Sequence, residues 1–357
     1  MTGDELSRRV KQEGDVFYQE DFSGLDLRNK DLSGGIFSEV CFDGCDFSGS
    51  DLGEVSFSQC FMNSAVFSGA CLNDAGFFEC SLENAGFGNI EVEYVKFIEC
   101  EMSRADFSSS RLDEMCVFSD CNLDKAAFGG AKLNTSVFNS CKMSNSDFSG
   151  AGLYKTTFYK CAFEGNDFTG AAICLSLFHG AGLSGMNFKN MDMTQCQFQE
   201  SILDGCDFSG AKLRQGGFMQ AMLEGSKFDN ADLELAVFYE AALRGASFKN
   251  AFMKMANMQY AGLEETDFSG ANLYQAQMEG IFATKAVFRG ADLTYADLSH
   301  ADLRQSDFSE AGLFMANLHE IKEQSTKWSE TGRSLAVGTN SKRLKAEQWG
   351  RSKYDQG

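Results

Sequence analysis

The chain contains no proline, and it has only two tryptophans and three histidines among its 357 residues. Without proline no backbone N–H is missing, which suits a chain whose amide groups are used in β-ladders. Three histidines offer little support for histidine-based catalysis or a histidine-rich metal site. No segment approaches the ~18 consecutive apolar residues of a membrane span. We therefore expect neither a membrane protein nor a histidine-dependent enzyme.

Positive charge is also scarce, since the formal net charge is −20 and the isoelectric point is about 4.6. An acidic body repels nucleic acid, so we expect no direct nucleic-acid binding. Only the tail from His319 onward is basic, with eight Lys or Arg against five Asp or Glu. The first residues, MTGDELSRRVKQEG, lack an apolar core, so we expect no secretory signal and a cytoplasmic protein.

What the chain has in abundance is a five-residue repeat. From Phe17 to Leu112, and after one inserted residue from Phe118 to Leu318, a large apolar residue or a valine falls at every fifth position. These central positions number 61, and only Ala283 among them is small. The residue two before each centre is small, the one between is often polar, and two turn formers follow. This alternation predicts three-residue strands joined by tight two-residue corners in a stacked solenoid.

The central positions also predict how many sides one coil has. One column at a spacing of 20 residues holds only phenylalanine: Phe128, Phe148, Phe168, Phe188, Phe208, Phe228, Phe248, Phe268, Phe288 and Phe308. The column that begins at Leu133 holds no Phe in ten positions. Three sides would mix Phe and Leu within each column, whereas an even number keeps them sorted. Four sides fill a square section evenly, so we predict a square tube with these ten phenylalanines in its core.

Segments such as Ala231-Asp232-Leu233 and Ala301-Asp302-Leu303 match the pattern A(D/N)Lxx. Over roughly residues 15–318 the chain thus resembles the pentapeptide-repeat family. The resemblance implies an all-β solenoid, a right-handed, four-sided β-helix of 20 residues per coil. The repeat count then gives about 15 coils and a rod roughly 70 Å long, with short helical caps at its ends. We predict three regions: an N-terminal capping helix in 1–16, the repeat β-helix in 17–318, and a C-terminal cap and basic tail in 319–357.

The two ends of the repeat carry helix signals. Thr2 and Glu5 form a T-x-x-E capping box, which favours a helix over about residues 4–12. After the last centre we expect a helical cap over 319–328, anchored by Ile321 and Trp328. The basic segment 341–354 is either a short helix or a disordered partner-binding tail.

Two places interrupt the repeat. One extra residue lies between Leu112 and Phe118, at a corner, and predicts a local bulge rather than a domain boundary. Ala283 stands at a centre with the bulky Phe282 beside it, which predicts a local adjustment of the register.

Cysteine follows the repeat as well. Ten of the 13 cysteines occupy the small position: Cys45, Cys60, Cys80, Cys100, Cys116, Cys121, Cys141, Cys161, Cys196 and Cys206. Ala, Ser and Thr fill the same position elsewhere, so Cys acts there as a small buried residue. We expect no disulfide framework and a reducing compartment. Only Cys41, Cys71 and Cys174 lie elsewhere, so a nucleophilic cysteine has little support.

Catalytic and metal-binding patterns are weak. His300 and His319 lie about one coil apart and are candidate neighbours, but a third ligand is not evident. Two exposed corner histidines are the favoured interpretation. The many Ser-Gly pairs recur as corners rather than as phosphate-binding loops. We therefore predict no catalytic, cofactor-binding or metal-binding residues, and no enzyme.

Acidic columns are the first candidate partner surface. Asp147, Asp167 and Asp207 fall in the outward slot of one face, and a second set at corners includes Glu164, Asp204 and Glu224. Outward Asp side chains also hydrogen-bond corner backbone, and corner charges are usually only solvated. The structural interpretation is favoured for both sets, and partner binding stays open.

Apolar outward positions are the second candidate surface. Val137 and Leu177 occupy outward slots, and Tyr159 and Tyr239 directly follow centres. Exposed apolar columns are typical of partner surfaces, although β-branched residues also simply favour strands. Trp328 and Trp349 in the tail are further candidates.

These features favour a non-catalytic scaffold, a rigid acidic rod that docks protein partners through its faces or its tail. The resemblance implies an alternative, because some family members mimic duplex DNA and bind type II topoisomerases. Here the longer rod, the absence of a long loop insertion and the basic tail depart from that branch. A secretion-linked effector or adaptor is a third possibility. The resemblance also implies a homodimer through the C-terminal coil, where Phe314, Met315, Ile321 and Trp328 either cap the coil or form the interface.

Overall fold

The computed structural model describes residues 1–354, which divide into two compact units: unit 1, Met1–Met186, and unit 2, from Asn187 onward. Within each unit the chain winds as a parallel β-solenoid, and each rung is hydrogen-bonded to the rung one coil later. The predicted all-β solenoid is therefore confirmed. The handedness, the number of coils and the three predicted regions stay predictions.

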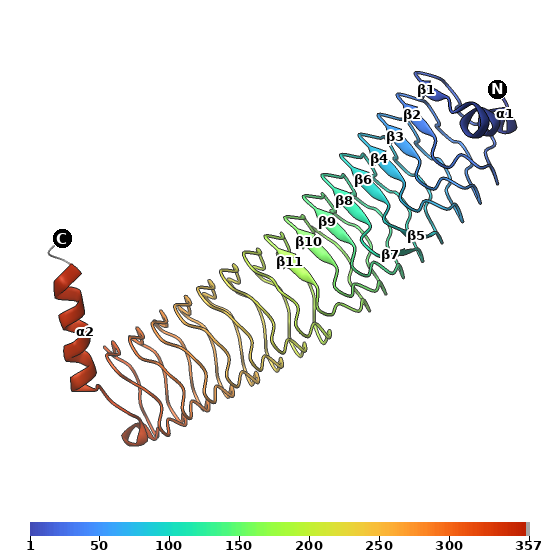
Figure 1. Ribbon diagram of the computed structural model, residues 1–357. Coiled ribbons are helices and arrows are strands. Elements are labelled where there is room, and N and C mark those ends of the chain that lie inside the picture. Colours follow the sequence, from blue (N-terminus) through green and yellow to red (C-terminus); the bar gives the residue numbers. More distant parts are fainter. Residues whose placement is uncertain (355–357) are drawn as a thin grey trace. The chain divides into compact units, whose positions relative to one another are not determined.

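The strands of unit 1 stack in one parallel sheet (Figure 1). Within the described residues this sheet has nine strands, in the order of the chain: β1 (Val16–Tyr18), β2 (Ile36–Ser38), β3 (Ser56–Ser58), β4 (Gly76–Phe78), β6 (Lys96–Ile98), β8 (Val117–Ser119), β9 (Val137–Asn139), β10 (Thr157–Tyr159) and β11 (Leu177–His179). A two-stranded sheet pairs β5 (Glu91–Glu93) with β7 (Arg111–Asp113). In unit 2 the same ladders consist of single bridges, such as Asn187 with Asp207.

Four ladders run through each coil, because four positions five residues apart each pair with the position 20 residues later. In the first coil the pairs are Val16 with Ile36, Asp21 with Cys41, Asp26 with Asp46, and Asp31 with Asp51. This pairing gives the coil four sides, as the sorting of Phe and Leu predicts. It also places every residue of one column directly over its neighbours, so that each corner and each face repeats the same environment.

The interior is filled by stacked central side chains. All ten phenylalanines of the predicted core column are buried. In unit 2 the rings of Phe228 and Phe248 lie 4.8 Å apart at 2° to one another, and Phe238 meets Phe248 edge-on at 5.7 Å and 90°. Parallel stacking within a column and edge-to-face contact between columns are the arrangements that aromatic quadrupoles favour. Burying each such ring contributes about 1.5–3 kcal/mol before the entropy cost is subtracted.

The small position beside each centre is buried too, and its polar groups bond to the previous coil. Ser226 Oγ donates to the carbonyl oxygen of Leu203 at 2.8 Å, and Cys80 Sγ makes the equivalent contact with that of Phe57 at 3.5 Å. All ten cysteines in this position are buried free thiols. Burial raises the pKa of the Cys45 and Cys116 thiols to about 11. Cys45 and Cys116 are therefore neutral space-fillers, and their thiols contact backbone carbonyl oxygens of the previous coil.

Native alkylation is expected to separate the cysteines into two classes. With iodoacetamide at neutral pH, Cys71 should react fastest because it is exposed, and Cys41 and Cys174 should follow because they are half-buried. The ten buried thiols should react only after unfolding in denaturant. Peptide mass spectrometry of the folded protein measures this directly. Labelling of an interior thiol as fast as Cys71 would contradict the inward assignment.

The inserted residue is absorbed at a corner. Glu114 and Met115 both adopt positive φ, 54° and 57°, where an ordinary corner has one such residue. Lys96 of β6 then pairs with Val117 of β8, one residue further along than the usual spacing, and the ladder continues. The predicted local bulge is confirmed.

Two sequence predictions about the repeat and its end are wrong. No register adjustment occurs at Ala283, because Phe282 pairs with Gly262 and Asp302 in the normal spacing. The buried side chain of Ile281, in the position that is usually small, occupies core volume beside the missing centre. The helical cap predicted over 319–328 is not found, because this segment continues the rungs.

The continuation has a physical cause in the open edge of the preceding coil. Lys322 N donates to Ala301 O and Lys327 N to Ser306 O, each at 2.9 Å. Backbone groups of a finished rung template the next one even where its centre is not apolar. Trp328 then stacks on Phe308 with 4.7 Å between ring centroids, and the Arg333 guanidinium lies 4.6 Å over the Trp328 ring.

Helices occur at both ends of the described chain. Helix α1 (Gly3–Arg8) has Thr2 as its N-cap, whose hydroxyl accepts from Glu5 N at 3.2 Å, and a π-helical turn (Arg9–Glu13) follows. A 3₁₀ turn (Arg333–Leu335) precedes α2 (Ser341–Tyr354). Of the two possibilities for the basic tail segment, the helix is the one observed.

Candidate functional site

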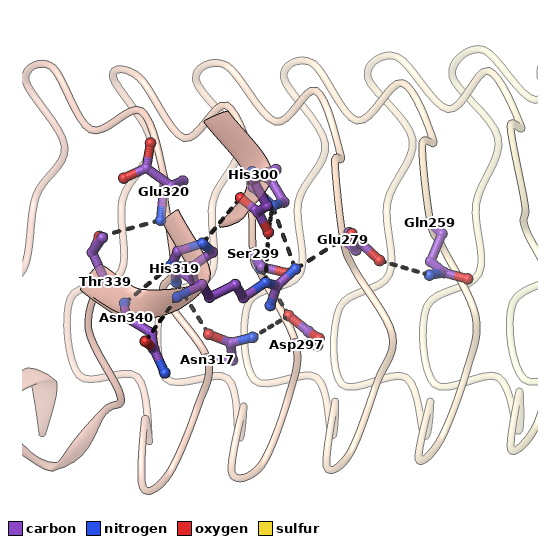
Figure 2. Close-up of polar contacts among 12 residues, drawn as sticks. Gln259, Glu279, Asp297, Ser299, His300, Asn317, His319, Glu320, Thr339 and Asn340 are labelled. Atoms are coloured by element: carbon purple, nitrogen blue, oxygen red, sulfur yellow. Dashed lines mark hydrogen bonds and ion pairs between the residues drawn. The ribbon is translucent and has the colours of Figure 1, made fainter. Parts of the chain in front are cut away.

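The corners of two successive coils bring two histidines together in unit 2. His300 N donates to His319 O at 2.8 Å, and the two rings meet edge-to-face with centroids 5.3 Å apart. The preceding outward residue fixes each corner, since Asp297 Oδ1 accepts from Ser299 N and Asn317 Oδ1 accepts from His319 N. Outward Asp and Asn therefore hold the backbone that carries the histidines (Figure 2).

Helix α2 begins at the same corner. Asn340 is its N-cap, and Asn340 Oδ1 accepts from Lys342 N at 3.0 Å and from Arg343 N at 3.1 Å. Glu320 N donates to Thr339 Oγ1 at 3.3 Å, which ties the segment before the helix to the last coil. The helix start is thus fixed by side-chain acceptors, as the preference for Asn at N-caps explains.

Four side chains fasten α2 to this corner, and we call His300, His319, Arg343 and Glu347 the latch. Arg343 and Glu347 are one helical turn apart and are bonded to each other, Nε to Oε1 at 2.7 Å. Each carboxylate oxygen of Glu347 faces one imidazole: Oε1 lies 3.4 Å from His300 Nε2 and Oε2 lies 3.3 Å from His319 Nε2. Arg343 Nη2 lies 3.4 Å from His300 Nε2 and 3.9 Å from Glu279 Oε1.

The backbone decides which nitrogen of His319 carries the proton. Asn340 N donates to His319 Nδ1 at 3.0 Å, so Nδ1 presents its lone pair. The neutral imidazole then has its proton on Nε2, which donates to Glu347 Oε2. His319 is 1% exposed, so the expectation of an exposed corner histidine is wrong for this residue, and both of its ring nitrogens are used inside the structure. A single buried ring therefore connects the N-cap of α2 to a carboxylate two turns further along the helix.

The same proton arrangement bears on metal binding. One ligand atom from each of His300, His319 and Glu347 lies within 4.8 Å of the others, and two imidazoles with a carboxylate suit zinc. A metal-bound imidazole carries a proton on its other nitrogen and donates it to an acceptor. Here a backbone N–H points at that nitrogen, and the Arg343 guanidinium adds a positive charge beside His300. The donor set therefore fits a hydrogen-bonded latch rather than a cation centre.

Charge at the latch favours the ionised carboxylate. The pKa of Glu347 lies below its ordinary value of 4.5, chiefly because Arg343 donates to it, with further lowering by the His319 hydrogen bond and the charge of His300. Partial desolvation opposes the shift. A cavity of about 270 Å³ opens beside the latch, and its lining is His300, Glu320, Lys322, Leu344, Glu347 and Gln348. This mixed lining offers both charges and little apolar surface.

Acidification is expected to release α2. Because docking lowers the pKa of Glu347, its contribution is complete above pH 4.5 and is lost as the pH falls through the docked value. Amide-exchange protection of α2, corrected for intrinsic rates, should therefore collapse in this range while circular dichroism still reports folded coils. Glu347→Gln serves as the control, because its α2 protection should not change over the same range. If the α2 amides of the unsubstituted protein stay protected at the lowest pH at which the coils are folded, the role of this carboxylate is contradicted.

The predicted acidic surface is built into the corners. Asp147 and Asp167 pair in adjacent rungs of unit 1, and their Oδ1 atoms accept from Ser149 N and Thr169 N, each at 2.8 Å. In unit 2, Asp207 makes the same bond with the residue two positions on at 2.9 Å. These bonds lower the pKa of Asp167 and of Asp207, although burial opposes the shift and is the largest single effect at Asp207. The structural interpretation of this set thus has direct support.

The acidic corner set is more mixed. Asp204 Oδ1 accepts from Glu224 N at 2.8 Å, which links two rungs of unit 2. The side chains of Glu164 and Glu224 are exposed. Their part in partner binding stays a prediction.

The predicted apolar residues fall in different places. Val137, Tyr159 and Leu177 lie on the adjacent strands β9, β10 and β11 of unit 1. Tyr239 lies in unit 2, where its ring packs edge-on against that of Tyr260 at 5.8 Å. Trp328 is half-buried at the end of the core, so its packing there explains why a tryptophan occurs at this position without a partner.

Trp349, in contrast, is 67% exposed on α2. Sequence reasoning missed Arg343 and Glu347 altogether. The only available signal was the spacing of the two histidines, because the approach of α2 depends on the path of the intervening chain.

Comparison with known proteins identifies the repeat. Residues 90–168 and 171–248 match the family model described as "Pentapeptide repeat region", and residues 21–53, 45–84, 255–282 and 272–309 match "Pentapeptide repeats (8 copies)". No curated protein sequence matches the chain. Within the described residues no helix has the length and apolar character needed to cross a membrane.

Several solved structures are similar to parts of the chain. A trypsin-treated variant of QnrB1, a plasmid-mediated fluoroquinolone resistance protein, is 23% identical; the match covers 57% of this chain and 88% of QnrB1, with a TM-score of 0.33. HetL, involved in heterocyst differentiation regulation in the cyanobacterium Nostoc sp., is 20% identical over 87% of this chain and 96% of HetL, with a TM-score of 0.24. A pentapeptide repeat protein of the Arabidopsis thaliana thylakoid lumen is 26% identical over 36% and 71% of the two chains, with a TM-score of 0.20. The family models and the ladder of five-residue rungs lead to one conclusion: this chain belongs to the pentapeptide-repeat family.

Proposed function

We propose that this protein is a non-catalytic interaction protein, a rigid acidic solenoid that docks protein partners through its faces or its C-terminal tail. The observation that carries the proposal is helix α2. It is a basic helix on an acidic protein, it is fastened by a polar latch, and it presents Trp349 with 67% of its surface exposed. An exposed tryptophan with adjacent basic residues is typical of an anchor for a protein partner.

The test compares capture of partners by the full chain, by Trp349→Ala and by a chain that ends at Gly338. The cut is placed there because Trp328 and the rung through Val337 belong to the last coil, so a shorter chain would expose core. We expect a partner that the full chain retains and both variants lose. A partner set that is the same for all three proteins would remove the tail from the proposal.

A second candidate function is DNA mimicry toward a type II topoisomerase, which the net charge of −20 favours. One column of carboxylates places a charge about every 4.8 Å. Duplex DNA carries a charge per roughly 1.7 Å of axis, so several columns together would be needed to imitate it. A gyrase supercoiling assay with and without a quinolone tests this function. If micromolar protein neither inhibits the gyrase nor protects it from the quinolone, this function is dismissed.

The homodimer through the C-terminal coil stays a prediction, which light scattering tests. In the structure the exposed end of that coil carries the Arg333 guanidinium over Trp328, with Arg333 Nη2 also 2.6 Å from Glu323 Oε2. A dimer through this end would have to accommodate or displace that polar cover.

A further inference from the structure

The corners of unit 2 all require a left-handed residue, but they meet this requirement differently. The second corner residue has φ near +60° in every case. One corner column uses glycine or asparagine almost throughout: Asn190, Gly210, Asn230, Asn250, Gly270 and Gly290. Glycine and asparagine are the residues that tolerate this conformation best, so such a corner is close to unstrained.

A neighbouring corner column places large apolar residues in the same strained conformation. Leu235, Met255, Tyr295 and Met315 have φ of 61°, 58°, 60° and 56°. Their side chains are nevertheless 36%, 43%, 46% and 46% exposed. Gln275 interrupts this column between Met255 and Tyr295. Tyr274 and Phe314, at the first position of the same corner, add to the row of apolar side chains, which we call the ridge.

The ridge costs stability within unit 2. A non-glycine residue held at positive φ costs on the order of 1 kcal/mol, and an apolar residue that stays partly exposed gains only part of its burial energy. The edge-to-face contacts of Tyr295 with Tyr274 at 5.8 Å and with Phe314 at 5.7 Å offset only part of this cost. Backbone strain combined with exposed apolar surface is what a contact surface requires, because its benefit arises only when a partner covers it.

The spacing of the ridge selects the shape of its partner. Successive rungs of a solenoid lie about 4.8 Å apart. An α-helix repeats its side chains every 5.4 Å turn, whereas a strand repeats them on one face every ~6.7 Å. The pitch of a helix is the closer match. Leu335, which accepts a backbone hydrogen bond from Met315 N, extends the line by one more rung.

Charges beside the ridge select the chemistry of the partner. Asp232 and Asp292 lie in the outward slots before the corner, and Asp297 lies in the slot after it. Three bases stand among them. Lys212 pairs with Asp232 in the ladder and is engaged with Asp192, and Arg214 is engaged with Glu234. Lys254 lies 5.6 Å over the Tyr274 ring. The remaining field is acidic, so an apolar stripe flanked by Lys or Arg is complementary to it.

We propose that the ridge docks the apolar stripe of a basic amphipathic helix supplied by a protein partner. This inference rests on the proposed function as an interaction protein, and it names a second docking surface, separate from the latch and Trp349.

The test uses the full chain and a fluorescent synthetic helix of Leu and Lys at amphipathic spacing, with a Leu and Glu helix of the same pattern as its counterpart. The ridge variant is Met255→Gly, Tyr295→Gly and Met315→Gly together. The matched control is Glu265→Gly, Lys285→Gly and Gln305→Gly, which changes the same corner position on another column, with φ of 61°, 60° and 62°. Both triple variants leave the net charge unchanged.

Fluorescence anisotropy should show binding of the Leu-Lys helix to the parent and to the control, weakened at least about tenfold in the ridge variant. The Leu-Glu helix should not bind. Equal binding to ridge variant and control would show attraction by charge alone and overturn the proposal, as would failure of the parent to bind. Self-association of the parent that the ridge variant abolishes would also overturn it, in favour of a second copy.

Stability provides an independent readout. The ridge variant should melt no lower than the parent, because glycine relieves strain at positive φ and little packing is lost. A lower melting temperature would mean that the ridge serves folding instead. If the triple variant does not fold, the corresponding Asn substitutions, which also suit this conformation, take its place. Failure of the parent to bind the Leu-Lys helix, together with capture of a partner that depends on Trp349, would refute this inference and leave the proposed function standing.

Discussion

Phe208→Asp is expected to prevent cooperative folding of unit 2. Phe208 is fully buried and stacks between neighbouring rings, at 5.1 Å from Phe188 and 4.9 Å from Phe228. The substitution removes an aromatic ring and leaves a carboxylate in an apolar interior, and together these effects cost about 5 kcal/mol or more. Urea denaturation followed by circular dichroism measures the loss.

Phe208→Leu is the matched control. Leucine fills the neighbouring centres in the two adjacent columns, Leu203 and Leu213, so it suits this interior. We expect a cost of about 1 kcal/mol and a transition that stays cooperative. Equal stability of parent and Phe208→Asp would mean that this position does not face the core.

His319→Ala is expected to free helix α2 while the coils stay folded. The imidazole accepts from the N-cap amide of Asn340 and donates to Glu347, and alanine can do neither. The Asn340 amide and the Glu347 carboxylate are then left without these hydrogen bonds, and a polar group that loses its partner costs more free energy than a pair removed together. Hydrogen exchange of the α2 amides should accelerate about tenfold or more, and tryptic cleavage after Lys342, Arg343 and Lys345 should accelerate with it.

Gln348→Ala tests whether any change on the inner side of α2 has this effect. Gln348 lines the neighbouring cavity but takes no part in the latch. Its α2 exchange should match the parent. If His319→Ala leaves exchange in α2 unchanged, then the helix is held by something other than the latch.

The fold could be derived from the sequence because its instructions are local and repeated. The size of each side chain, read every five residues, assigns it to core, small slot or corner without any long-range information. The ten centres 20 residues apart that include Phe208 are all Phe, whereas the column of Leu213 contains none. This sorting was enough to predict four sides. Errors arose where one coil compensates internally, as Ile281 does for Ala283, and where edge hydrogen bonds extend the ladder past the last apolar centre.

The candidate site was less accessible to sequence reasoning. His300 and His319 could be placed near one another from the coil length alone. Glu347 could not be added to them, because it lies 28 residues beyond His319 and its approach depends on the path of an irregular segment. The ridge had a readable signal that was missed, since Leu235, Met255 and Tyr295 stand one corner after a column that carries glycine or asparagine almost throughout.

The central claim is that a four-sided coil stacks side chains 20 residues apart, which leaves only surfaces and ends for function. Nuclear Overhauser contacts among the side chains of protein labelled at Phe rings and Leu methyl groups measure this spacing most directly. The account predicts an unbroken series of contacts from Phe208 to Phe228 and from Phe228 to Phe248, whose ring centroids lie 4.9 Å and 4.8 Å apart. Contacts from Phe208 to Leu223, at the spacing of a three-sided coil, in place of that series would contradict it.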